Sequence, residues 1–319
     1  QIEFGSLKIS LKEIKDMWLK PLSSIYPMKE DQDGEIENYI YNKGNVIKSS
    51  LAIVKPRVFI PVFPGTSCEY EMVKAFEKAG AETDVFVFRN LSPQTIKDSI
   101  EELNIRIRQS QILALAGGMT AGDEPDGSGK FVAAIFKNEL LKEAIMEHLY
   151  KRDGLIIGIS NGFQALMKLG LLPFGEIRDI DEDYPALAYN NLHKHISTFV
   201  RTKVVSNLSP WLNMCNLGDV YCMPISHGEG RFVADEKLIQ QLKEKGQIAT
   251  QYVDDENKPT YRGCYNPLGS IEAIEGITSP DGRVFGKMAH SERIDMDLYK
   301  NIPGIKEQPI FASGVKYFR

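Results

Sequence analysis

The stretch of sequence that decides the fold is Leu155–Pro173, LIIGISNGFQALMKLGLLP. Its first five residues, Leu155–Ile159, are apolar or small and predict a buried strand, and a helical pattern begins directly after Ser160. Gly158 and Gly162 lie two residues to either side of Ser160. This G-x-S-x-G spacing at a strand-to-helix junction is typical of a nucleophile elbow, in which a strained turn holds the central side chain exposed. Glycine-rich turns without any chemistry share the same spacing, so a base must also be found.

On both sides of this stretch, short apolar runs alternate with helical patterns, as in βαβ units with a mainly parallel sheet. We expect strands at Arg57–Phe63, Thr83–Phe88, Gln111–Ala116 and Leu155–Ile159. We expect helices at Glu69–Ala79, Ser92–Arg106, Ser128–Tyr150 and Asn161–Gly170. Later strands are separated by turns instead of long helices, at Arg201–Val205, Val220–Ile225, Ile248–Tyr252, Ser270–Thr278 and Arg283–Met288. The turn Ser279–Gly282, SPDG, joins the last two. The prediction is an α/β fold with helices flanking the sheet and a mixed or antiparallel extension.

The first 55 residues differ from the rest of the chain. Ser10 followed by Glu13 is a capping-box signature, and apolar residues then recur at helical spacing up to Pro21. The polar stretch Glu30–Ser50 has the turn residues and low apolar content of a linker. We expect residues 1–55 to form a connector arm with one amphipathic helix, which packs on the main body or on a neighbour absent from this chain. Residues 56–319 would form the main domain.

Composition and charge exclude several classes of function. The 319 residues carry 38 Lys plus Arg against 43 Asp plus Glu, a net charge of −5, which argues against sequence-independent nucleic-acid binding. No apolar run approaches the roughly 18 residues needed to cross a bilayer, and the first twenty residues lack the apolar core of a secretory signal. Four cysteines are present, with neither metal-ligand spacing nor a disulfide framework: Cys68, Cys215, Cys222 and Cys264. We expect a cytoplasmic protein with free thiols, no membrane contact and no nucleic-acid partner.

The base is predicted from a histidine that follows the last strand. His290 comes directly after that strand, and Glu292 lies two residues further on. In an extended segment residues i and i+2 face the same side, so the carboxylate can orient the imidazole, as the third member of a catalytic triad does. On spacing alone a surface histidine with an incidental glutamate is the simpler interpretation. The elbow at Ser160 on the same chain reverses that preference, because a serine nucleophile requires a base.

The other histidines favour no metal site. His148 lies in a charged helix and is expected on a solvated face. His193 and His195 form an H-x-H pair in a polar loop, but no third ligand follows at metal spacing.

The order of the triad residues along the chain also separates two enzyme classes. In an α/β-hydrolase the acid usually lies between the nucleophile and the histidine, whereas here it follows the histidine, as in class I glutamine amidotransferases.

Six stretches, in order, resemble the C-terminal glutaminase domain of the large, single-chain phosphoribosylformylglycinamidine synthases. They are FPGTSCEYEM at 63–72, AGGMTAGDEPDGSGK at 116–130, GISNGFQALMKLGLLP at 158–173, SHGEGRF at 226–232, YNPLGS at 265–270 and GITSPDGRVFGKMAHSER at 276–293. The resemblance covers most of residues 57–319 and implies a flavodoxin-like, class I glutamine amidotransferase fold. Residues 1–55 would then be the connector from the synthase portion, and the start at Gln1 suggests a processed product or part of a longer chain.

The resemblance implies a role for each matching residue. Ser160 stands at the nucleophile position, His290 at the general base and Glu292 at the orienting acid. The implied substrate-binding residues are Gly117, Gly118, Asn161, Gln164, His227 and Gly228. Among them, the backbone amides of Gly118 and Asn161 would form the oxyanion hole, Gln164 would bind the glutamine, and His227-Gly228 would contact its amino-acid end. The SHGEGRF stretch is equally compatible with a structural turn held by a salt bridge from Glu229 or Arg231.

The implied reaction is the hydrolysis of glutamine to glutamate and ammonia. The ammonia would pass to the synthase domains, which use ATP and Mg²⁺ to convert formylglycinamide ribonucleotide to the amidine in purine biosynthesis. The intact enzyme is thus a ligase with glutamine as the nitrogen donor. The implied partners are glutamine and the N-terminal synthase domains. No cofactor is expected in this part of the enzyme, and no metal.

The sequence departs from the family's pattern at the nucleophile. The family motif reads GICNG, and this chain reads GISNG around Ser160. Glutaminase chemistry depends on a thiolate, and a hydroxyl is far less acidic, so we expect little or no hydrolysis by Ser160. Three explanations stay open: an engineered Cys-to-Ser replacement, a natural chain that serves as a catalytically dead glutamine-binding scaffold, and a serine hydrolase or peptidase on the same fold. Cys68, in the first matched stretch, is expected to be a buried small residue.

Overall fold

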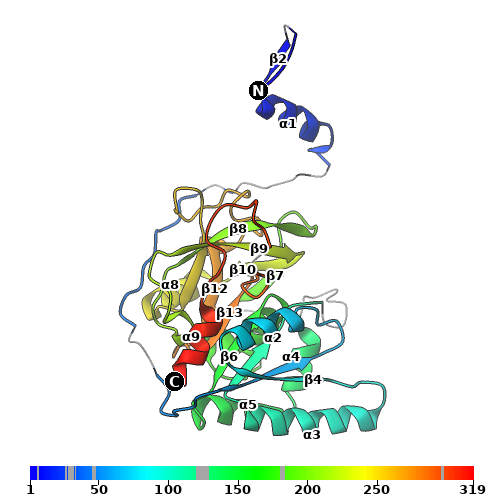
Figure 1. The fold of residues 1–319 in the computed structure, drawn as a ribbon, viewed down its shortest axis with the longest axis vertical. Helices are drawn as coiled ribbons and strands as arrows, with labels where there is room; N and C mark the ends of the chain where they lie inside the picture. Colours follow the sequence, from blue (N-terminus) through cyan, green and yellow to red (C-terminus); the bar gives the residue numbers. More distant parts are fainter. Residues whose placement is uncertain are drawn as a thin grey trace.

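A central sheet of nine strands organises the computed structural model, which describes residues 1–5, 7–25, 27, 32, 34–44, 48–119, 129–179, 184–295 and 298–319. The strand order is β4-β3-β5-β6-β13-β12-β11-β8-β9 (Figure 1). The first half of the chain contributes β3 (Arg57–Val62), β4 (Glu82–Val87), β5 (Ile112–Leu115) and β6 (Leu155–Ile159). The second half contributes β8 (Ile196–Val204), β9 (Val220–His227), β11 (Ile248–Tyr252), β12 (Ile274–Thr278) and β13 (Val284–Lys287).

The sheet changes from parallel to antiparallel at β13. Strands β4, β3, β5, β6 and β13 are mutually parallel, with Gly158 of β6 opposite Gly286 of β13. Beyond β13 each neighbouring pair is antiparallel, and the turn Ser279–Gly282 joins β12 to β13 through a Gly282 N–H bond to the Ser279 carbonyl. Every residue of β6 is buried, as its continuous apolar run predicts. The predicted parallel core with an antiparallel extension is therefore confirmed.

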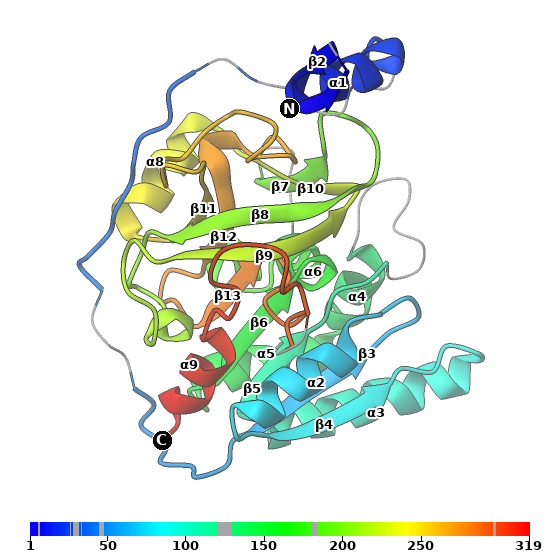
Figure 2. The same cartoon turned by 45° about the horizontal axis from the view of Figure 1, so that its top comes forward.

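Helices cover both faces of the parallel half. In Figure 2, α2 (Glu69–Lys78) lies on one side of the strands, and α3 (Pro93–Gln109) and α5 (Glu139–Tyr150) lie on the other. The remaining helices of the body are α4 (Lys130–Phe136), α6 (Asn161–Leu169), α7 (Leu171–Phe174), α8 (Glu236–Lys245) and α9 (Ile310–Tyr317). The described residues also include the short 3₁₀ helices η1 (Lys20–Leu22), η3 (Pro210–Leu212) and η4 (Ile271–Ala273). Within the described ranges no helix combines the length and apolar character that crossing a bilayer requires.

One expected helix needs correction, and several elements were not predicted. The single helix expected at Ser128–Tyr150 is two helices, because the Asn138 side chain accepts the Leu140 N–H and caps a new helix; Ser128 itself lies outside the described residues. Helix α8 was missed although Asp235 caps its start and Gly246 ends it in the left-handed conformation. A small antiparallel sheet of β7 (Ala186–Tyr189) and β10 (Glu229–Val233) was also missed.

The N-terminal arm has two parts that relate differently to the body. A hairpin of β1 (Ile2–Phe4) and β2 (Leu7–Ile9) precedes α1 (Leu11–Leu19), whose capping box of Ser10 and Glu13 is confirmed. No residue of α1 is buried, and Figure 1 shows this segment standing away from the body. The chain then runs along the body, where the Tyr41 N–H donates to the Val205 carbonyl at 2.8 Å. Residues 6, 26, 28–31, 33 and 45–47 of the expected connector arm lie outside the described residues.

Candidate active site

Ser160 occupies the strained turn between β6 and α6. Its φ of 56° and ψ of −111° are sterically costly for a residue with a side chain. A Cβ on Gly158 would lie 2.6 Å from the carbonyl carbon of Gly162, and a Cβ on Gly162 would lie 2.1 Å from the Leu115 carbonyl oxygen. Both glycines are therefore required for the close approach of strand and helix that the elbow spacing predicts.

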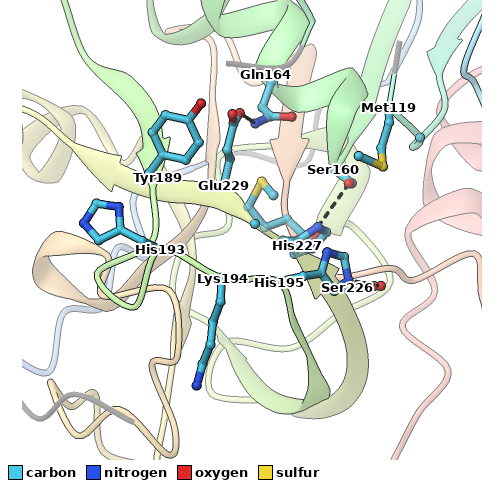
Figure 3. Close-up of a pocket in the computed structure, with 13 residues that line it drawn as sticks. Met119, Ser160, Gln164, Tyr189, His193, Lys194, His195, Ser226, His227 and Glu229 are labelled. Carbon is cyan, nitrogen blue, oxygen red and sulfur yellow. Dashed lines mark hydrogen bonds between the residues drawn. The ribbon is translucent and has the colours of Figure 1, made fainter. Parts of the chain in front are cut away.

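The side chain of Ser160 lines a cavity of about 280 Å³ (Figure 3). Residues implied by the family resemblance that line the same cavity are Gly118, Gln164, His227 and Gly228. Gly118 has a φ of 142°, and a Cβ there would lie 2.4 Å from the Gly65 carbonyl oxygen, so this position requires glycine. Most of the loop that follows, residues 120–128 of the matched stretch at 116–130, lies outside the described residues.

His290 and Glu292 form the buried pair that their spacing predicts. His290 Nδ1 donates to Glu292 Oε1 at 2.6 Å, and each residue is only 3% exposed. Burial disfavours the charged imidazole, but the Glu292 charge and hydrogen bonds to Cys68 and Glu292 outweigh it and raise the pKa of His290 to about 9. The imidazole is therefore protonated at neutral pH.

The hydroxyl of Ser160 is bonded to a different histidine. Ser160 Oγ lies 3.3 Å from His227 Nδ1, while His227 Nε2 lies 2.9 Å from the Met288 carbonyl oxygen. Since that carbonyl can only accept, Nε2 carries the proton and Nδ1 accepts from the hydroxyl. Burial, followed by the charge of His290, lowers the pKa of His227 well below its ordinary value. His227 is thus neutral at pH 7, and its role beside residue 160 was missed by sequence reasoning.

Gly117 marks the point where the side chains of the site converge. A Cβ there would lie 3.0 Å from His290 Cε1, 3.3 Å from Cys68 Sγ and 3.4 Å from the Ser160 Cβ. The rings of His227 and His290 stack with centroids 5.2 Å apart. Glycine at 117 therefore leaves a small space that three reactive side chains share. Asn161, the residue implied to supply an oxyanion amide, is buried as the first residue of α6.

Cys68 is buried, as expected, but its surroundings were not foreseen. Its Sγ, a ring nitrogen of His290 and a carboxylate oxygen of Glu292 all lie within 4.8 Å of one another. In the part of the chain that the structure describes, these three residues are grouped closely enough to hold a metal ion. The short bond from Nδ1 to Glu292 already engages one ring nitrogen. The expectation of no metal stays a prediction.

The cavity is also lined by polar side chains that form hydrogen bonds with one another. Gln164 Nε2 donates to Glu229 Oε2 at 2.9 Å, and both side chains are buried (Figure 3). His195 Nε2 lies 2.9 Å from Ser226 Oγ, and His193 also lines the cavity. In the sequence, Ser226 and Glu229 belong to the SHGEGRF stretch, and His193 and His195 form the H-x-H pair.

His148 is a structural residue and not the surface residue that its charged helix suggested. It is fully buried, its Nε2 donates to the Leu155 carbonyl at 3.1 Å, and a Cβ on Gly154 would come within 2.3 Å of its ring. Burial lowers its pKa to about 4. His148 therefore holds the start of β6 in place and stays neutral at pH 7.

A parallel sheet with a strained strand–turn–helix residue beside a buried His–Glu pair defines a class of protein, the class I glutamine amidotransferases. The chain belongs to the family of CobB/CobQ-like glutamine amidotransferase domains, which matches residues 55–318.

Its relatives include phosphoribosylformylglycinamidine synthase subunit PurQ of Methanococcus maripaludis strain S2, 36% identical over 242 residues, 75% of this chain and 83% of the relative. The same subunit of Sulfurimonas denitrificans is 31% identical over 251 residues, 78% of this chain and 96% of the relative. A solved structure, that of PurLQS from Thermotoga maritima, superposes with a TM-score of 0.59 at 27% identity and covers 83% of this chain and all of that one.

Proposed function

We propose that this chain is the glutaminase part of a phosphoribosylformylglycinamidine synthase. It would hydrolyse glutamine to glutamate and ammonia, and the ammonia would feed the ATP-dependent amidination of formylglycinamide ribonucleotide. The observation that carries the proposal is the 2.6 Å bond between buried His290 and Glu292, next to the elbow at residue 160. The names of the PurQ relatives support the pathway. ATP and Mg²⁺ would be bound by the synthase portion, which is the partner of this domain.

The polar groups of the cavity fit the α-ammonium group and the side-chain amide of glutamine. The buried Glu229 carboxylate suits the α-ammonium group of glutamine, and Gln164 holds that carboxylate in place at 2.9 Å. At the other end, the Gly118 backbone amide donates no hydrogen bond to another described residue, so it is available to an oxyanion. Glutamine bound between these groups would place its side-chain amide at residue 160.

The protonation states of the two histidines support the proposal that Ser160 is a poor nucleophile. A protonated His290 stabilises a thiolate, but it cannot remove the proton of a hydroxyl. His227 accepts a hydrogen bond from Ser160, but its lowered pKa makes it a weak base. We therefore infer little glutamine hydrolysis by Ser160 itself. The bond from Ser160 to His227 is also the observation that favours the second candidate, a serine hydrolase with His227 as base.

Glutamate release by the parent chain and by Ser160→Cys tests the proposal, with Ser160→Ala as the control. We expect Ser160→Cys to exceed Ser160→Ala by at least about 100-fold, because the thiol meets a site already built for a thiolate. A folded Ser160→Cys variant that releases no glutamate would show that the glutaminase proposal is wrong. Labelling of Ser160 by a fluorophosphonate, abolished in His227→Ala, would favour the serine hydrolase instead.

A further inference from the structure

The catalytic pair of this chain faces a thiol although residue 160 is a serine. Because Glu292 occupies Nδ1 of His290, the nitrogen left for a nucleophile is Nε2. Cys68 Sγ, a ring nitrogen of His290 and a carboxylate oxygen of Glu292 lie within 4.8 Å of one another. The hydroxyl of Ser160 is instead bonded to His227. His227 is thus hydrogen-bonded to Ser160, whereas His290, which is paired with Glu292, lies beside Cys68.

Resting on the glutaminase function proposed above, we propose that Cys68 is the nucleophile that His290 and Glu292 activate in this chain. Cys68, His290 and Glu292 would then form a complete Cys-His-Glu triad, with the nucleophile supplied by the start of α2 instead of the elbow. This assignment replaces the expectation that Cys68 is an inert small residue.

Cys68 lies at the start of a helix and close to the imidazole of His290. Cys68 is the N-cap residue of α2, a helix of ten residues, so its side chain lies at the positive end of the helix dipole. Ser67 Oγ lies 3.8 Å from Cys68 Sγ and can donate to it. Glu69 and Glu71 add negative charge to the same first turn, whereas His290 carries a positive charge at neutral pH.

The thiol also lies beside the proposed oxyanion site. The Ser67 and Cys68 N–H groups donate to the Gly117 carbonyl at 3.0 and 3.4 Å, which ties the start of α2 to the loop that carries Gly118. The vacant Cβ position of Gly117 is 3.3 Å from Cys68 Sγ and 3.4 Å from the Ser160 Cβ. Ser160 and Gly118 line the cavity, whereas Cys68 lies behind its lining. The two distances from the Gly117 Cβ position put Cys68 Sγ within about 6.7 Å of the Ser160 Cβ.

The proposed reaction balances without a metal ion or a redox partner. The Cys68 thiolate attacks the side-chain amide carbon of glutamine, and the charge that develops on the oxygen is held by the Gly118 amide. His290 gives its proton to the amide nitrogen, the C–N bond breaks, and ammonia leaves a thioester on Cys68. Water then attacks the thioester and transfers a proton to His290. The C–S bond breaks, which releases glutamate and restores the thiolate.

The first experiment uses a cysteine of the same chain as a matched control. Cys222 is 7% exposed, as Cys68 is, but burial raises the pKa of its thiol. At pH 7 we expect iodoacetamide to alkylate Cys68 at least about tenfold faster than Cys222, and we expect Glu292→Gln to remove the difference. Equal rates for the two cysteines in the parent chain would overturn the proposal.

The second experiment locates the nucleophile with 6-diazo-5-oxo-L-norleucine, a glutamine analogue that alkylates the attacking atom. Peptide mass spectrometry of the parent chain should find the adduct on Cys68, and glutamine should protect against it. Glutamate release should fall about 100-fold or more in Cys68→Ser and stay within about threefold in the matched control Cys222→Ser. An adduct on Ser160, or full activity in Cys68→Ser, would overturn the assignment. If Ser160→Cys is active while Cys68 of the parent chain stays unlabelled, the glutaminase function stands and this inference alone fails.

Discussion

The stacked rings of His227 and His290 differ in charge although their centroids are only 5.2 Å apart. His290 donates to a carboxylate and is protonated at neutral pH, whereas His227 donates to a backbone carbonyl and is neutral. The first state could be predicted from the sequence, because Glu292 lies two residues from His290 on an extended segment. The second could not, since a backbone carbonyl leaves no signature in the sequence. The contact between Cys68 and His290 joins residues more than 200 positions apart, and no local pattern announces it.

The raised pKa of His290 makes the stability of the protein depend on pH above neutrality. The folded-state pKa of about 9 exceeds the ordinary 6.5, so the stabilisation is complete below pH 6.5 and is lost as the pH rises through 9. The loss should be about 3 kcal/mol in the free energy of unfolding. Glu292→Gln removes the charge that favours the imidazolium, so it should flatten this dependence. Urea unfolding at pH 6.5 and pH 9.5 checks this, and an equal loss in both proteins would contradict it.

At the scale of elements, the prediction succeeded where local signals agree and failed where packing or pairing decides. A few adjacent residues are enough to predict these elements: the buried apolar run predicts β6, the two glycines predict the elbow, and the Ser10 cap predicts α1. The break between α4 and α5 depends on one capping side chain, Asn138, inside a continuous helical pattern. Strands β7 and β10 are short, and each pairs only with the other in the described part of the chain, so neither has the burial pattern of a central strand.

The space around two glycines, Gly162 of the elbow and Gly228 between β9 and β10, predicts different outcomes for their substitution by alanine. In a helix such as α6, alanine is normally favoured over glycine by about 0.5 to 1 kcal/mol. Gly162→Ala should nevertheless destabilise the fold by about 3 kcal/mol or more, because its Cβ would lie 2.1 Å from the Leu115 carbonyl oxygen. At Gly228 a Cβ meets nothing within 4 Å, so Gly228→Ala should leave stability within about 0.5 kcal/mol of the parent. Urea titration of the three proteins measures both effects. A Gly162→Ala protein as stable as the parent would refute the close-approach argument.

At the scale of the whole molecule, the arm is not one unit. The predicted division into residues 1–55 and 56–319 stays a prediction, but residues 34–44 and 48–54 make specific bonds to the body. The Tyr39 hydroxyl donates to the Lys243 carbonyl at 2.6 Å, and the Ser49 and Ile53 N–H groups donate to carbonyls of Tyr317 and Phe318. By contrast, α1 exposes Met17 at 70% and Trp18 at 83%, so its apolar stripe contributes nothing to the body. A polar linker pattern alone does not distinguish a bound segment from a free one, because backbone bonds to the body require no particular side chain.

Two truncations separate these parts of the arm. Removing residues 1–27 should leave the free energy of unfolding within about 0.5 kcal/mol of the parent, because no residue of α1 is buried. Removing residues 1–54 also deletes the bonds of Tyr39, Tyr41, Ser49 and Ile53 and exposes the body where Tyr39 is buried. At about 1 kcal/mol per hydrogen bond, the longer truncation should cost at least about 2 kcal/mol. Urea unfolding of both truncated proteins at one pH measures the difference. A comparable loss from the shorter truncation would mean that α1 packs on the body, and would remove the reason to look for its partner in a synthase portion.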